Sequence, residues 1–371
     1  MFYHLLLPLT DQQFLGFYPF NVFQYITFRV VIAFIFALLY TIIAGPHIIN
    51  KLKKHHLLQE ISTCLPHTHN EKRGTPSMGG IIPLSGVLIT SLLWNNLTSS
   101  SILIMYLTTI WLGSMGFFDD YHKNVLRSGK KLRSHYKLLG QIILALLIGI
   151  VLFSYRAEAI SFSRISLPFF KDITLNLGVF FIPFVIFLIV SSSNACNITD
   201  GLDGLATGTV IISLIGLGIM SYIKGNMLHA EHLRMDYLAD AGELTIYISA
   251  LIGALLGFLW FNAKPAEVFL GDTGSLALGG QLAVISILLR EEIFLMIIGG
   301  VFIIEIASSI LQISYFKYTK GRLGTGKRLF RCAPLHHHYE LKGLSEEKIV
   351  ARFWIVALLF LAVGLATIKL R

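Results

Sequence analysis

The sequence predicts an all-α polytopic membrane protein, and two observations carry that prediction. Hydrophobic residues make up 54% of the 371 residues and charged residues only 14%, whereas soluble domains usually carry about 25% charged residues. The apolar residues also form unbroken runs close to the roughly 20 residues that a spanning helix needs. They lack the residue-by-residue alternation that is typical of a transmembrane β-strand.

We expect about ten membrane-spanning helices, which form a single integral-membrane domain over residues 1–371. In chain order, the expected spans are 23–44, 79–97, 101–118, 138–155, 178–193, 205–222, 244–260, 273–289, 293–315 and 350–368. Each is an apolar run that ends at polar, charged or glycine-rich residues. The outer segment 156–177, between the fourth and fifth spans, alternates weakly in hydrophobicity, which is typical of a small β-hairpin.

The positive residues predict the orientation of these spans. Of the 30 Lys and Arg residues, 20 fall in one set of loops, which are 46–78, 119–137, 194–204, 261–272 and 316–349. Cytoplasmic loops are enriched in Lys and Arg. We therefore expect this set in the cytoplasm, and an even number of spans then places both termini outside, in the periplasm. The same bias accounts for the net charge of +9, so nucleic acid is not an expected partner.

A polar stretch at 191–206 separates the fifth and sixth spans. It contains Asn194, Asn197, Asp200 and Asp203, with glycines beside both acids. Carboxylates three residues apart share one face of a helical turn, and glycine lets the backbone approach a ligand closely. The stretch suits a metal, a phosphate or a nucleoside. The alternative is an Asn/Asp/Gly turn that only connects two helices.

Two further polar regions precede it. The run 72–80, which includes Lys72 and Thr75, combines basic residues, hydroxyls and amides before a helix, an arrangement that suits an anion. A basic turn at the membrane surface is the alternative. At the end of the third span, Asp119 and Asp120 face the negative end of the helix dipole, so a cation should offset them. Nearby lysines or Mg²⁺ would do so, unless both acids simply point into water.

The fourth cytoplasmic loop, 261–272, contains Asn262, Phe269 and Asp272. Asp272 occupies a position where an N-cap is expected before the eighth span, and capping alone would explain it. Phe269 is either a stacking face for a base or an ordinary aromatic residue of the membrane interface.

The last cytoplasmic loop contains three consecutive histidines, His336, His337 and His338. Three neighbours in a loop do not ligate one ion comfortably, so they are better suited to donate hydrogen bonds to phosphate or to carry protons. A solvated loop is the alternative. Glu305 lies within the ninth span, where a charge costs at least about 2.5 kcal/mol. It should therefore pair with a neighbouring helix or contact the site.

Taken together, four motifs resemble those of the polyprenyl-phosphate N-acetylhexosamine-1-phosphate transferases. They are Asp119-Asp120 with Lys123, Asn197-x-x-Asp200-Gly-x-Asp203-Gly, Asn262 through Asp272, and Pro334-Leu-His-His-His-x-Glu340. The resemblance runs from about Lys72 to Glu340. The Leu-His-His-His-x-Glu form is similar to the branch that uses UDP-N-acetylmuramoyl-pentapeptide, because relatives that use UDP-N-acetylglucosamine tend to carry a His-Ile-His-His-like version.

The resemblance implies a Mg²⁺-dependent transfer of phospho-N-acetylmuramoyl-pentapeptide from UDP to undecaprenyl phosphate in the bacterial inner membrane, by a homodimer. Transfer of N-acetylglucosamine-1-phosphate is the nearest alternative, and a transporter is a remote one. The implied catalytic residues are Asp119, Asp120, Asp272 and His337, with Asp272 as the metal ligand. Residues expected to contact the substrates are Lys72, Thr75, Lys123, Lys137, Asn194, Asn197, Asp200, Asp203, Asn262, Phe269, Glu305, His336 and His338.

Overall fold

The computed structural model describes residues 3, 21–54, 74–124, 134–154, 163–166 and 174–368, and it confirms the all-helical class. Among these residues, nine helices are long and apolar enough to cross a membrane. They are α2 (Ile26–Lys54), α4 (Ser100–Asn124), α5 (Ser134–Ser154), α7 (Phe181–Thr199), α8 (Leu205–Lys224), α10 (Ala241–Asn262), α11 (Gly271–Leu289), α13 (Gly300–Leu323) and α15 (Glu346–Thr367). Shorter elements are η2 (Asn21–Gln24), η4 (Gly178–Phe180), α3 (Ile81–Trp94), α9 (Met227–His232), α12 (Glu292–Ile298) and α14 (Leu335–Glu340).

The second expected span, 79–97, is shorter than predicted. Helix α3 has only 14 residues, which gives a length of about 21 Å against a hydrocarbon core of about 30 Å. Its start is delayed because the amides of Gly79 and Gly80 donate to the carbonyls of Phe269 and Leu270, in a distant loop. These residues extend the apolar run in the sequence but belong to a paired loop in the fold.

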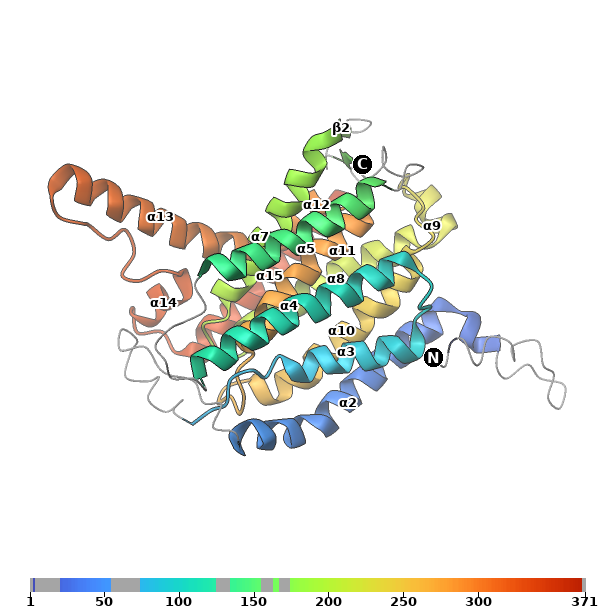
Figure 1. Ribbon diagram of the computed structural model, residues 1–371, viewed down its shortest axis with the longest axis horizontal. Coiled ribbons are helices and arrows are strands. Elements are labelled where there is room, and N and C mark those ends of the chain that lie inside the picture. Colours follow the sequence, from blue (N-terminus) through green and yellow to red (C-terminus); the bar gives the residue numbers. More distant parts are fainter. Residues whose placement is uncertain are drawn as a thin grey trace.

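The ninth expected span, 293–315, is two helices. Helix α12 ends at Ile298, α13 begins at Gly300, and the break falls at Gly299. Two consecutive glycines have weak helix propensity, so a break there costs little. Helix α13 continues to Leu323, past the expected end, and its second half projects away from the other helices (Figure 1).

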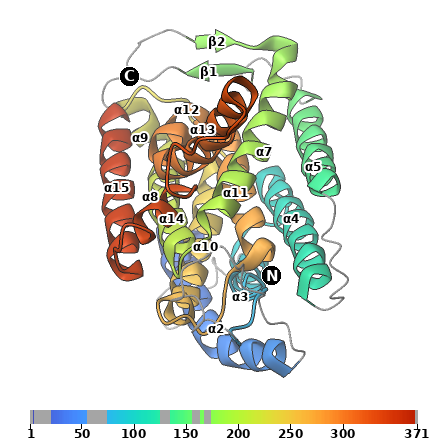
Figure 2. The ribbon, with the colours of Figure 1, turned by 90° about the vertical axis from the view of Figure 1, so that its left-hand side faces the viewer.

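Helix α11 lies at the centre of the bundle (Figure 2). It packs against α3, α4, α7 and α8, and all of its residues from Thr273 to Leu289 are buried. Glycine makes this close packing possible. A Cβ placed on Gly279 would lie 2.4 Å from the carbonyl oxygen of Ser192, so only glycine lets α7 approach α11 at this point.

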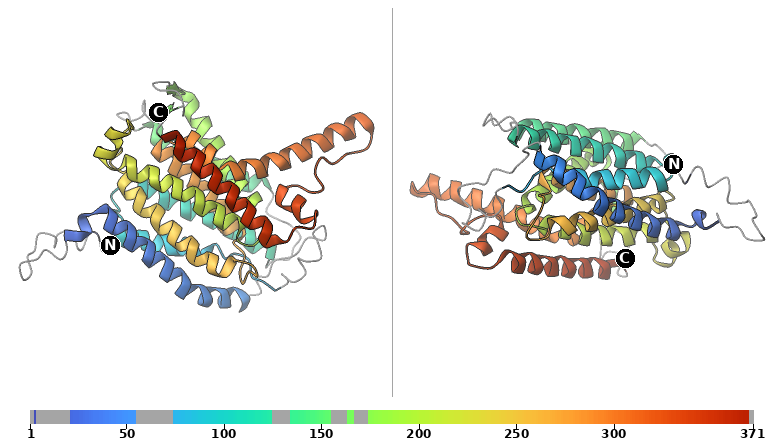
Figure 3. Two further views of the ribbon diagram at one scale, coloured as in Figure 1. Left: turned by 180° about the vertical axis from the view of Figure 1, so that it is seen from behind. Right: turned by 90° about the horizontal axis from the view of Figure 1, so that it is seen from below.

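The hairpin expected at 156–177 is present in the described part of that segment. Strands β1 (Arg164–Ser166) and β2 (Thr174–Asn176) pair antiparallel, with Ile165 opposite Leu175. The hairpin lies at the same end of the bundle as α9, the first residues of α2 and the last residues of α15 (Figures 1 and 3). Helix α14 lies at the opposite end.

Candidate active site

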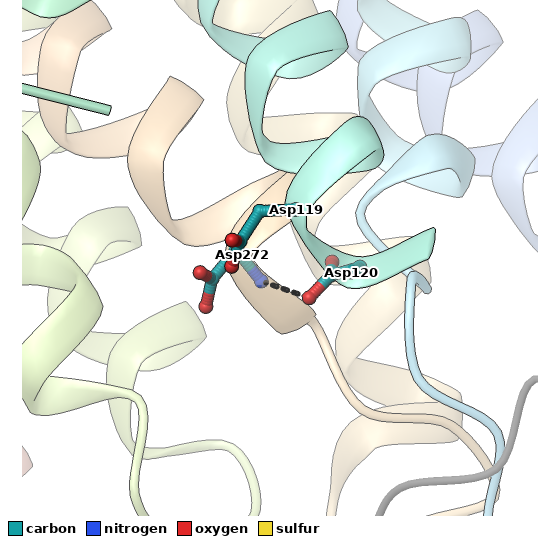
Figure 4. A group of neighbouring side chains, drawn as sticks. All are labelled: Asp119, Asp120 and Asp272. Carbon is teal, nitrogen blue, oxygen red and sulfur yellow. Dashed lines mark hydrogen bonds between the residues drawn. The ribbon is translucent and has the colours of Figure 1, made fainter. Parts of the chain in front are cut away.

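Three carboxylates from two helices converge where α4 ends and α11 begins (Figure 4). Asp119 and Asp120 lie in the last turns of α4, and Asp272 lies in the first turn of α11. One oxygen from each of the three lies within 4.8 Å of the others. Both α4 acids are buried, whereas Asp272 is partly exposed. The two acidic motifs, far apart in the sequence, thus form one cluster.

The backbones of three helices touch where this cluster forms. A Cβ on Gly116 of α4 would lie 2.2 Å from the carbonyl oxygen of Asp272, and a Cβ on Gly80 would lie 2.2 Å from the amide nitrogen of Gly274. Any larger residue at either position would force the helices apart. The two glycines therefore set the distance between the α4 acids and the first turn of α11.

Two lysines bridge Asp119 and Asp272. The Nζ atom of Lys123, one turn after Asp119 on α4, lies 2.6 Å from Asp119 Oδ2 and 2.8 Å from Asp272 Oδ2. Lys137 reaches in from α5, with its Nζ atom 2.5 Å from Asp119 Oδ2 and also paired with Asp272 Oδ2. These ammonium groups supply the cationic partners that the acids at the end of α4 require.

The carboxylate of Asp272 is held from its other side by α7. Asn197 Nδ2 donates to Asp272 Oδ1 over 3.0 Å and also to the hydroxyl of Ser275 over 2.8 Å. Because Asn197 and the lysines contact different oxygens of Asp272, the orientation of this carboxylate is fixed.

Asp120 faces the backbone of α11. Asp120 Oδ1 accepts the amide of Asp272 over 3.2 Å (Figure 4), and its Oδ2 accepts the amide and the hydroxyl of Thr273 over 2.9 and 2.7 Å. Asp200 lies in the turn between α7 and α8, near the charges of Asp272, Asp120 and Asp203. Burial, followed by the charges of neighbouring carboxylates, raises the pKa of Asp200 to about 8.

This arrangement decides the alternative raised for Asp272. Helix α11 begins at Gly271 with Leu270 before it, and no side chain at that position caps it. Asp272 lies inside the first turn and its carboxylate faces the lysines. The capping interpretation of Asp272 is therefore wrong, because the Asp120 side chain, from α4, accepts the amides of Asp272 and Thr273.

Two asparagines expected to contact substrate use their amide groups within the protein. Asn262 is 2% exposed; its Oδ1 accepts the hydroxyl of Thr207 and its Nδ2 donates to the carbonyl of Val268. Asn194 Nδ2 donates to Gln141 of α5 and to a carbonyl of its own helix. The structure thus places both outside the carboxylate cluster, as braces between elements.

The remaining loop residues form a frame around the cluster. Asp203 Oδ2 accepts the amide of Ala266 over 3.3 Å, and the backbone amide of Asp203 donates to Glu346 at the start of α15. Thr75 precedes Pro76, whose carbonyl accepts the amide of Phe269 over 2.9 Å. The segments that carry Thr75 and Phe269 are therefore paired, while Lys72 lies outside the described residues.

Glu305 and His336 pair with each other. Both side chains are fully buried, and His336 Nδ1 lies 3.0 Å from Glu305 Oε2. The ring of His336 also covers Gly201, where a Cβ would lie 2.1 Å from Nε2. Of the two possibilities left open for Glu305, pairing with a neighbouring element is the one observed. The pair ties α13 and α14 to the acidic turn after α7.

The other two histidines point elsewhere. The segment expected to be a loop forms the short helix α14, so successive side chains diverge by about 100°. His337 Nδ1 lies 2.7 Å from Glu340 Oε2, and His338 Nδ1 accepts the amide of Arg331. Burial and nearby cations lower the pKa of His338. The ring centroids of His336 and His337 lie 4.2 Å apart, whereas the ring of His338 contacts the Arg331 backbone.

The cluster fits a hard divalent cation. Asp119 Oδ1 is buried and has no hydrogen-bond partner among the described residues, although such an atom normally finds one. Mg²⁺ prefers carboxylate oxygens, often one or two from protein, and completes its shell with water and phosphate. Asp119 and Asp272 are the residues that fit this requirement.

Two contributors were missed from the sequence, Thr273 and Ser275. Both follow Asp272 within one helical turn, and hydroxyl residues in the first turn of a helix commonly bond to nearby polar groups. Their position directly after Asp272 could have identified both residues from the sequence.

Comparison with known proteins places the chain among bacterial transferases. Residues 102–290 match the model of glycosyl transferase family 4. Three similar relatives are each named phospho-N-acetylmuramoyl-pentapeptide-transferase: those of Chlorobium chlorochromatii (45% identical over 351 residues), Chlorobaculum parvum (44% over 351) and Chloroherpeton thalassium (45% over 351). Each alignment covers 95% of this chain and 95% of the relative.

Proposed function

Because the chain belongs to the phospho-N-acetylmuramoyl-pentapeptide-transferase family, we propose that it transfers phospho-N-acetylmuramoyl-pentapeptide from its UDP derivative to undecaprenyl phosphate. The products are the undecaprenyl-linked sugar diphosphate and UMP, in the first membrane step of peptidoglycan synthesis. The chain is a multi-pass bacterial membrane protein. The names of the relatives favour the muramoyl-pentapeptide nucleotide over UDP-N-acetylglucosamine as the donor.

One structural observation supports the proposal. Asp119 and Asp272 share two lysines at the first turn of α11, and a buried oxygen of Asp119 is left without a hydrogen bond among the described residues. Phosphoryl transfer depends mainly on positioning and on neutralising the charge of the phosphates. A site with fixed carboxylates for Mg²⁺ and two ammonium groups for phosphate oxygens supplies both.

The chemistry requires one bond to form and one to break. An oxygen of the lipid phosphate attacks the β-phosphorus of the nucleotide, and the bond from that phosphorus to the bridging oxygen breaks, so UMP leaves with the electron pair. Mg²⁺, when bound, would neutralise charge on the diphosphate. In this proposal Lys123 and Lys137 bind phosphate oxygens, Asn197 keeps Asp272 oriented, and His337 has a further catalytic role.

We favour direct attack over a phospho-enzyme. A monoalkyl phosphate has its second pKa near 6, so the lipid phosphate is mainly dianionic at pH 7 and hardly needs a base. Asp119 would orient this phosphate or remove a residual proton. We expect Asp119→Asn to keep measurable turnover at alkaline pH. A sugar-phosphate adduct trapped on Asp119 would instead establish the two-step route.

We propose that the site faces the cytoplasm, since α2, α4 and α13 each end in a turn that carries basic residues. In a variant without the native cysteines, Tyr339→Cys on α14 and Leu228→Cys on α9 form a matched pair, because both side chains are exposed and lie at opposite ends. An impermeant thiol reagent added to intact cells should label Leu228→Cys only. Labelling of Tyr339→Cys alone would invert the orientation.

Substrate identity is tested by release of UMP. Purified protein in detergent is incubated with undecaprenyl phosphate, Mg²⁺ and either the muramoyl-pentapeptide nucleotide or UDP-N-acetylglucosamine, with EDTA as the control. Metal-dependent UMP from the first donor alone is expected. Release from the second donor alone would assign the protein to the sister activity, and release from neither would favour transport. Light scattering of the same sample tests the expected homodimer.

A further inference from the structure

The first turn of α11 is capped by residues from elsewhere in the chain. The first four amides of any α-helix have no partner within the helix. In α11, the amides of Asp272 and Thr273 donate to Asp120 of α4. The residue before the helix is Leu270, which offers no side-chain oxygen, and no side-chain cap occurs there. Two of the first four amides of α11 thus depend on one distant carboxylate, that of Asp120.

Asp120 is committed to this task with both of its oxygens. It accepts three hydrogen bonds, from the Asp272 amide and from the amide and hydroxyl of Thr273. Its residue is only 3% exposed. Gly271, with φ of +70°, leaves the necessary space, because a Cβ there would lie 2.7 Å from Asp120 Oδ2. The carboxylate therefore fills a cradle made by the α11 backbone.

Asp119 is equally buried but has different hydrogen-bond and ion-pair partners. Successive side chains on a helix point about 100° apart, so adjacent acids face different surroundings. Asp119 pairs with Lys123 and Lys137, and its Oδ1 has no hydrogen bond among the described residues. The two adjacent acids, both expected from the sequence to be catalytic, thus face different partners.

We propose that Asp120 is a positioning residue, which fixes the first turn of α11 so that the Asp272 carboxylate is held toward Lys123 and Lys137. This inference rests on the proposed transferase function. Asp120 acts through the α11 backbone and touches neither the reacting phosphates nor the metal. The competing assignment makes Asp120 a third metal ligand or a general base.

Thr273→Val separates the two assignments, because it removes one hydrogen bond to Asp120 and leaves every carboxylate in place. Removing such an outer partner typically weakens metal binding by about 10-fold to 100-fold. We expect Thr273→Val to weaken Mn²⁺ binding, measured by electron paramagnetic resonance, by about 10-fold, and to lower kcat in parallel. A directly acting Asp120 would keep Mn²⁺ affinity and kcat at the wild-type level in Thr273→Val, which would overturn the proposal.

Thr209→Val is the matched control. Thr209 is also fully buried, and its hydroxyl donates only to carbonyls of its own helix, α8. The variant should keep the wild-type Mn²⁺ affinity. If Thr209→Val weakens binding as much as Thr273→Val does, the effect reflects general loss of packing and the proposal fails.

Asp120→Asn gives a second, independent measurement. Its amide group would present N–H donors to backbone donors, so we expect a loss of Mn²⁺ affinity of about 100-fold. Adding Thr273→Val should then cause little further loss, because both changes break one contact. A positioning role would be contradicted if the two losses of Mn²⁺ affinity were fully additive. It would also be contradicted if Asp120→Asn recovered activity at alkaline pH. If the wild-type protein binds Mn²⁺ but releases no UMP, the proposed function fails while these binding comparisons stay valid.

Discussion

The two ends of α11 both bury charged side chains, but they balance the charges differently. At its C-terminal end, Lys224 of α8 donates to the carbonyl of Leu289 over 2.8 Å and pairs with Glu291 over 2.7 Å. A cation at the C-terminus of a helix complements the helix dipole. Here one lysine satisfies one carboxylate and one carbonyl.

At the N-terminal end, carboxylates outnumber cations. Three acids, Asp119, Asp120 and Asp272, lie beside the two lysines Lys123 and Lys137. At the C-terminal end, the additional acid is Glu292, and burial raises its pKa to about 8, so it is mainly neutral at pH 7. Buried charge alone therefore does not identify a functional site. An excess of fixed carboxylates beside shared lysines does.

The largest effect is expected from Gly116→Ala, which would separate α4 from the N-terminal end of α11. The new Cβ would lie 2.2 Å from the carbonyl oxygen of Asp272, and a misplacement of about 1 Å can cost about 100-fold in rate. We expect UMP release to fall by at least that factor. Gly321→Ala on α13 is the control, since a Cβ there meets nothing within 4 Å. Wild-type activity in Gly116→Ala would show that the contact of α4 with α11 is not needed.

Lys224→Gln should affect stability and leave metal binding unchanged. It removes one partner of a pair whose side chains are only 4% and 0% exposed, and breaking such a pair costs about 3 kcal/mol of unfolding free energy. Denaturant titration in detergent measures this loss. An altered affinity for Mg²⁺ in this variant would mean that the two ends of α11 are coupled.

Lys137→Gln should have a smaller effect that depends on metal. Lys123 still bridges Asp119 and Asp272. We therefore expect the free energy of unfolding to fall by only about 1 kcal/mol in the absence of metal. The site then carries more uncompensated negative charge, so Mg²⁺ should raise the melting temperature more than it does in the wild-type protein. An equal Mg²⁺ effect in Lys137→Gln, Lys224→Gln and the wild-type protein would remove the distinction between the ends.

The smallest effect concerns pH at the C-terminal end. Because the folded pKa of Glu292 is raised to about 8 from 4.5, the folded state binds a proton that the unfolded state has lost. Its contribution to stability is therefore full below about pH 4.5 and falls as the pH rises toward 8. Glu292→Gln should match the wild-type melting temperature at low pH and exceed it increasingly toward pH 8. Identical pH profiles would show that Glu292 is charged in the folded protein.

The sequence predicted the helical elements well because spanning helices are local, and their apolar runs are readable without knowledge of packing. Its errors arose where distant backbone intervened. Helix α3 begins late because Gly79 and Gly80 pair with Phe269 and Leu270. The break at Gly299 was signalled by the glycine pair itself, and the helix after Pro334 by a proline at its start.

The site was predictable in its residue types but not in its contacts. Asp119, Lys123, Asn197 and Asp272 were singled out, and the structure brings them together, while their roles stay predictions. The partners of Asp120 lie 152 and 153 residues further along the chain. Only the packing of α4 on α11 makes that contact, so no local pattern reveals it.

The burial of α11 predicts which backbone amides exchange slowly with solvent. Backbone amides exchange with solvent when a segment opens locally, and the slowest ones belong to the best-packed elements. Since α11 is buried from Thr273 to Leu289, its amides should be among the last to exchange, long after those of the projecting part of α13. Asp272 is thus attached to a helix that opens late, and partial opening of the outer helices would leave its carboxylate in place.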